Sequence, residues 1–200
     1  MGQPNQLDLF LDYQVSVTEP VNDFYKQLND SHLDSELPVW EEAYKKFFPN
    51  FKCSVYFQRD SDFQRLGGDR QVICDGGKNY VIDEKIRYPS KSGRVYTDIL
   101  LEYVSNNRRN SPGWVCKPLL ADYIAYYVKG LGLIYMLPVG PLQIVWQKHK
   151  QKWLQREDQL IAAQNKGYET LNFAIEPSEL FGAIFNNFTI QVNGVKPLEN

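Results

Sequence analysis

Two aspartates lie at matched positions on either side of a predicted tight turn. The segments 70–74 and 79–87 have strand-like composition, and the sequence DGG between them is typical of a tight hairpin turn. If the turn centres on Gly76, residues at equal distances from it face each other, and Asp69 and Asp83 each lie seven residues away. The spacing therefore predicts two carboxylates side by side.

A lysine accompanies this pair. Side chains alternate between the faces of a strand, so Lys85 shares the face of Asp83, whereas Glu84 points to the other face. Like charges directly opposite each other destabilise a sheet unless something neutralises them, and a divalent cation would do so. Mg²⁺ or Mn²⁺ is bound by one or two carboxylates with waters and phosphate oxygens, and a lysine can position the attacking water. This chemistry suits hydrolysis of a phosphodiester.

Structural roles for the same residues remain open. Asp69 could be an ordinary strand-entry residue after two glycines, and Asp83 and Lys85 could form a simple ion pair. On the next predicted strand, Asp98 and Glu102 share a face and are further candidates for the site, although an ion pair with a nearby lysine or arginine also explains them.

The remaining elements follow from periodicity and from the glycines and prolines between segments. A helical stripe begins at Pro38, with Trp40, Ala43, Tyr44 and Phe47 on one apolar side. We expect helices at 38–48, 118–129 and 141–157 with a short one after 177, and strands at 51–58, 70–74, 79–87, 97–105, 132–139, 168–175 and 189–192. These elements predict an α/β fold with a mixed central sheet flanked by helices.

The order of helix, hairpin, strand, helix and strand, with Asp69 followed by Asp83-Glu84-Lys85, resembles the PD-(D/E)XK nuclease superfamily. The run VIDEKIR followed by TDILLEYVS and PGW is also similar to small members from phages and mobile elements. The resemblance covers residues 38–138 and implies a restriction-endonuclease-like α-β-β-β-α-β core. This chain has Gly67-Gly68 where the superfamily commonly has proline before the first aspartate.

The resemblance also implies roles for individual residues. Asp69 and Asp83 would be metal ligands, the main-chain carbonyl of Glu84 would complete the metal shell, and Lys85 would orient the water. Many members add an acid from the first helix, and here Glu42, or Glu41 beside it, is the candidate. The implied activity is Mg²⁺-dependent DNA cleavage. The alternative is a catalytically inactive nuclease-fold protein that binds nucleic acid or another protein.

The distribution of charge is in keeping with a polyanionic substrate. Residues 1–46 carry nine acids and three lysines, a balance of −6, so the rest of the chain is +4 within the net −2. This excludes a strongly basic protein that coats nucleic acid, yet leaves room for a local basic surface. The candidate DNA contacts are Arg87, Lys91, Arg94, Arg108 and Arg109.

Length and composition bound the class of protein. The chain has 200 residues, of which 43% are hydrophobic, so we expect a single domain over 1–200. Within it we expect a core at about 38–138, an acidic N-terminal extension at 1–37, and C-terminal helix and strand additions at 139–200. No run is long and apolar enough to span a membrane, and the start lacks a secretory pattern. The three widely spaced cysteines are expected to be reduced, in a cytoplasmic protein. A homodimer would suit double-strand cleavage, but no interface is readable.

Overall fold

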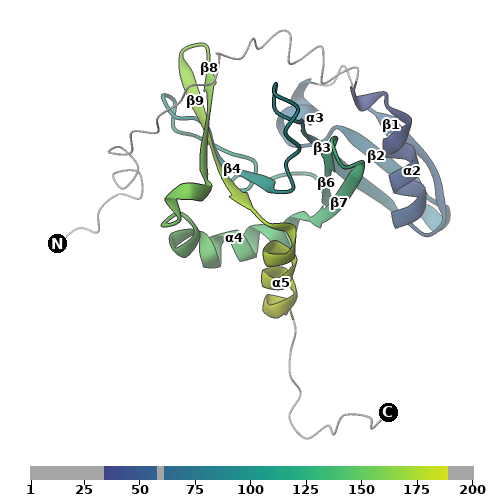
Figure 1. Ribbon diagram of the computed structural model, residues 1–200. Coiled ribbons are helices and arrows are strands. Elements are labelled where there is room, and N and C mark those ends of the chain that lie inside the picture. The colour runs from purple at the N-terminus through teal and green to yellow at the C-terminus, as the bar shows by residue number, and fades with distance from the viewer. Residues whose placement is uncertain (1–33, 58–60, 189–200) are drawn as a thin grey trace, which may run out of the picture.

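The computed structural model describes residues 34–57 and 61–188, in which the strands form two sheets (Figure 1). The first is a five-stranded mixed sheet in the order β1-β2-β3-β6-β7, and the second is a four-stranded sheet in the order β5-β4-β9-β8. The strands of the first sheet are β1 (Phe51–Tyr56), β2 (Arg70–Cys74), β3 (Asn79–Arg87), β6 (Tyr123–Val128) and β7 (Leu133–Pro138). Those of the second are β4 (Ile99–Asn106), β5 (Ser111–Pro112), β8 (Leu160–Asn165) and β9 (Tyr168–Ile175). The helices are α2 (Pro38–Phe47), α3 (Ser61–Arg65), α4 (Val139–Trp153) and α5 (Pro177–Phe188), so the fold is mixed α/β.

Strand β3 lies at the centre of the five-stranded sheet. It pairs with β2 in antiparallel fashion and with β6 in parallel fashion. The pairs between β2 and β3 run from Arg70 opposite Ile82 to Ile73 opposite Asn79, so each pair is symmetric about Gly76. Gly76 has a φ of 79°, which glycine adopts without a steric penalty. The predicted hairpin register is therefore confirmed.

Helix α2 covers one face of this sheet, at the right of Figure 1. Proline stands in its first turn, where the missing N–H costs nothing, and its apolar stripe faces inward as predicted. Trp40 and Tyr44 are buried against Val72, Ile82 and Ala125 of the sheet. This packing anchors the helix over β2, β3 and β6.

The opposite face of the sheet packs against the second sheet and α4. Ile124 and Leu137 from the first sheet share a core with Leu101 and Phe173 from the second, and Trp146 of α4 is buried in the same cluster. Side chains on this face of β3 therefore point into the space between the two sheets.

Two sequence predictions about the middle of the chain were wrong. The segment 118–129 is not a helix, because residues Tyr123–Val128 form strand β6. Strand β6 is covered on both faces of the sheet, so its side chains are apolar in both directions, as those of a buried helix would be. Its tyrosine, isoleucine and valine residues are types that favour strands. The strand at 97–105 is present as β4, but it belongs to the second sheet instead of adding a third strand beside the hairpin.

The other predicted elements in the described part of the chain are confirmed, namely α2, β1, β2, β3, β7, α4, β9 and α5. Strand β8 had not been predicted, and the expected strand at 189–192 lies outside the described residues. No helix among the described residues is long and apolar enough to cross a membrane.

The close approach of Gly113 to β4 gives a test of this packing. A Cβ atom at position 113 would lie 2.1 Å from the carbonyl oxygen of Glu102, so Gly113→Ala should lower the free energy of unfolding by about 1–3 kcal/mol. Gly182 in α5 has open space around it, so Gly182→Ala should raise that free energy by about 0.5–1 kcal/mol. Urea denaturation of both variants measures the two changes. Equal effects of the two substitutions would contradict the packing around Gly113.

Candidate active site

The Asp69 and Asp83 carboxylates lie near each other at the open end of the hairpin, where the negative charge of Asp83 acts on Asp69. Backbone bonds to β3 hold Asp69 in place: its amide nitrogen donates to the Ile82 carbonyl oxygen at 2.9 Å, and its Oδ2 accepts the Glu84 N–H at 2.8 Å. The Asp83 side chain is only 3% exposed. The side chains of Asp69 and Asp83 are therefore electrostatic neighbours, and Asp69 also closes the end of the β2–β3 ladder.

Lys85 forms an ion pair with Asp83 on the same face of β3. Burial alone would lower the pKa of Lys85, but the negative charges of Asp83 and Asp69 outweigh it, so the pKa lies above its usual value. Lys85 is therefore protonated at neutral pH and acts as a positive charge. Its side chain is 32% exposed, so part of the side chain is accessible to solvent.

Asp69 titrates in an unusual range for an aspartate. Burial raises its pKa to about 7, and the neighbouring charge of Asp83 acts in the same direction. Lys85 and the Glu84 N–H oppose this shift without cancelling it. Near neutral pH the two carboxylates therefore resist carrying two negative charges, which is the situation that a bound divalent cation relieves. The chemistry of this donor set fits Mg²⁺.

A third acid approaches from the other sheet. Glu102 of β4 interacts electrostatically with Lys85 and Asp83, and the Trp114 N–H donates to its carboxylate. Burial raises the pKa of Glu102, while Lys85 and Lys117 lower it in part. The site therefore depends on both sheets. Glu102 was a secondary candidate from the sequence, whereas Lys117 had no sequence signal that distinguished it.

The described residues contain no group of three or more His, Cys, Asp or Glu side chains arranged to hold a metal ion. A cation at Asp69 and Asp83 would need its other ligands from water, substrate or main chain. The N–H and C=O groups of one strand residue point to the same side, so the Glu84 carbonyl faces the side on which its N–H meets Asp69.

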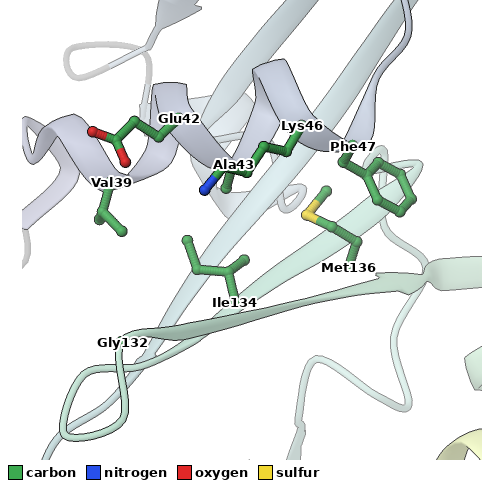
Figure 2. A pocket seen from close by; sticks show the side chains of 8 residues that line it. All are labelled: Val39, Glu42, Ala43, Lys46, Phe47, Gly132, Ile134 and Met136. Atoms are coloured by element: carbon green, nitrogen blue, oxygen red, sulfur yellow. The ribbon is translucent and has the colours of Figure 1, made fainter.

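Glu42 is not brought to this site. It is exposed on α2, which covers the face of the sheet toward which Glu84 points, whereas Asp83 points to the opposite face. Figure 2 shows Glu42 beside a groove between α2 and the β7 residues Ile134 and Met136. The prediction that Glu42 joins the two aspartates was therefore wrong, because helix and aspartates lie on different sides of one sheet.

The five residues predicted to contact nucleic acid differ in whether their charged groups are exposed or already bound within the protein. Arg87 is bonded to Asp98 at 2.9 Å and lies 3.8 Å from the centre of the Tyr96 ring, so its guanidinium is engaged within the protein. Arg94 lies 5.6 Å from the same ring and is exposed. The other three, Lys91, Arg108 and Arg109, are also exposed. Asp98 takes the ion-pair role that the sequence offered as an alternative.

A second polar cluster lies on the α2 side of β3 and had no sequence signal beyond the alternation of faces. Glu84 Oε1 accepts hydrogen bonds from the Tyr44 hydroxyl at 2.7 Å and from Arg70 Nε at 2.6 Å. Arg70 also donates to the Ser35 carbonyl oxygen at 2.5 Å. Glu84 Oε2 is buried without a hydrogen-bond partner among the described residues. This cluster ties α2 to the strand that carries the candidate site.

The raised pKa of Asp69 predicts how stability changes with pH. A carboxyl with a higher pKa in the folded than in the unfolded state binds more protons when folded, so this group lowers the free energy of unfolding as pH rises from about 4 to about 7. Asp69→Asn should remove that slope and raise the free energy of unfolding at pH 8 by about 1–3 kcal/mol. Urea denaturation across this pH range measures the difference. The control is Asp75→Asn in the exposed turn, and a parallel pH dependence of Asp69→Asn and wild type would contradict the assignment.

Comparisons of the chain with protein-family profiles, with curated proteins and with solved structures gave no match.

Proposed function

We propose that the chain is a Mg²⁺-dependent DNA endonuclease, or a related DNA-processing phosphodiesterase, of the PD-(D/E)XK type. The observation that carries the proposal is the pair of neighbouring carboxylates of Asp69 and Asp83, with Lys85 bound to Asp83 on the same face of β3. A structural ion pair needs one acid for one lysine, whereas this cluster buries a second acid whose pKa is raised to about 7. A site that binds a cation accounts for the second acid.

Each residue of the site has a role in this proposal. Asp69 and Asp83 would hold Mg²⁺ or Mn²⁺, and the Glu84 main-chain carbonyl would face the same ion. The bound cation would stabilise the charge that develops on the phosphate and would help to ionise the attacking water. Lys85 remains protonated beside Asp83, so its contribution is to orient that water and the phosphate by charge.

The surrounding features agree with a DNA substrate. Lys91 and Arg94 follow β3 directly and are exposed, so they can contact phosphates near the site. The fold is mixed α/β with a five-stranded mixed sheet, and we propose that β1, β2, β3 and β6 with α2 correspond to a restriction-endonuclease-like core. The free cysteines suit a protein of a reducing compartment such as the cytoplasm.

A catalytically inactive nuclease-fold protein is the second candidate. It is favoured by the lack of three converging metal-ligand side chains among the described residues and by the pairing of Lys85 with Asp83. Such a protein would bind DNA or another protein through its exposed basic residues, such as Lys91 and Arg94, without cleaving a substrate.

Cleavage of plasmid and oligonucleotide DNA in the presence of Mg²⁺ or Mn²⁺ distinguishes the two candidates. We expect cleavage by the wild type and a loss of at least about 100-fold in Asp83→Ala and in Lys85→Ala, because each removes a group that acts on the reacting phosphate or water. Asp75→Ala and Lys78→Ala at the exposed hairpin turn are the matched controls and should keep full activity.

A second measurement keeps binding separate from catalysis. Mn²⁺ should raise the melting temperature of the wild type and of Asp75→Ala, but not that of Asp83→Ala. Cleavage that is equal in all variants would assign the activity to another site or to a contaminant. DNA binding in a mobility-shift assay, with neither cleavage nor a Mn²⁺ shift, would establish the inactive candidate.

A further inference from the structure

No described strand pairs with the outer edge of β7. β7 ends the order β1-β2-β3-β6-β7 and pairs with β6 alone among the described strands. Its sequence, LIYMLP, contains no charged residue. Edge strands usually carry charges or other features that prevent pairing with a further strand, because their free N–H and C=O groups are a template for it. β7 is therefore suited to receive another strand.

A groove lined by apolar and charged side chains lies beside this edge, between α2 and β7. Its volume is about 330 Å³, and its floor is formed by Ile134 and Met136 of β7 (Figure 2). The α2 side contributes Val39, Ala43 and Phe47, and Phe47 is 44% exposed. The apolar surface thus continues from the edge strand onto the adjoining helix, as an interface would require.

Two opposite charges flank the groove on α2. Glu42 and Lys46 are one helical turn apart and both line it. At the same spacing, Glu41 and Lys45 form an ion pair at 2.6 Å, whereas Glu42 and Lys46 form no ion pair with each other or with another described residue. The groove therefore presents one negative and one positive charge in a fixed order along the helix.

We propose that the edge of β7 and the adjoining groove bind a second copy of this chain. A two-fold axis beside β7 would set the two β7 strands antiparallel and join the five-stranded sheets into one. The same axis would run the two α2 helices antiparallel across the interface. Glu42 of each copy would then lie opposite Lys46 of the other, so the charge order of the groove is complementary to itself.

The self-complementary charges favour this occupant over an unrelated protein. In an isologous dimer the same surface patch of both copies meets across a two-fold axis, so the patch must be complementary to itself. Glu42 and Lys46, one helical turn apart, meet that condition because the axis brings each of them opposite the other residue type. The proposal uses none of the residues assigned to phosphodiester cleavage, so it stands or falls separately from the proposed function.

Charge reversal on α2 tests the proposal by sedimentation equilibrium of the full chain. The wild type should have about twice the 23.3 kDa mass of one chain. Glu42→Lys and Lys46→Glu should each raise the dimer dissociation constant by about tenfold, because two attractive contacts become repulsive. The double variant Glu42→Lys/Lys46→Glu restores both contacts with the charges exchanged, and its dissociation constant should return to within about threefold of the wild type.

Glu41→Lys is the matched control, because it makes the same change in net charge one residue away on α2 and outside the groove. It should leave the dissociation constant unchanged. A wild type that stays monomeric up to about 100 μM would overturn the proposal, since roughly 5.5 kcal/mol of association free energy corresponds to that concentration. Single variants that dimerise as the wild type does, or a double variant that fails to recover, would also overturn it.

Discussion

The neutralisation of charge along β3 is the constraint on which the rest of the structure depends. Three successive residues of this central strand, Asp83, Glu84 and Lys85, are charged, and the strand has a neighbour on each side and a packed layer on each face. Charged groups are costly to bury unless they are paired and hydrogen-bonded. Alternation sends Glu84 to one face and the other two to the opposite face, so the fold must supply partners on both.

Each partner comes from a different element, and this explains the arrangement of layers around β3. On the α2 side, Tyr44 and Arg70 bond to Glu84, which fixes the helix over the hairpin. On the other side, Asp69, which directly precedes β2, and Glu102 from the second sheet lie near the Asp83–Lys85 pair. A surplus of acid remains there, and that surplus is what distinguishes the candidate site from an ordinary ion pair.

The hairpin was predictable because its register follows from local chemistry. A glycine with positive φ fixes the turn, and counting outward from Gly76 places every β2–β3 pair. The segment that became β6 was not predictable in the same way, since a short run that is apolar on every side has no period that separates a buried strand from a buried helix. The sequence also did not show which sheet contains β4. This strand follows β3 in the chain but pairs with β9, about 70 residues later. The approach of Glu102 to the site depends on that long-range pairing, whereas the separation of Glu42 from the site follows from the packing of α2 on the opposite face of the first sheet.

The path of the chain between the two sheets has a consequence for the way the protein folds. The chain leaves the first sheet after β3, builds β4 and β5 in the second, returns for β6 and β7, and leaves again for β8 and β9. Neither sheet is made from one continuous stretch of sequence, and the parallel β3–β6 ladder forms only after the chain between them has been closed into a loop. Contacts of this kind slow folding and couple distant parts of the chain.

A chain cut after β7 would keep both aspartates and Lys85 yet lose the β9 partner of β4, so Glu102 would no longer be held by a paired strand. The position of Glu102 in the site therefore depends on the C-terminal strands, although nothing in the chemistry of the site itself requires those strands.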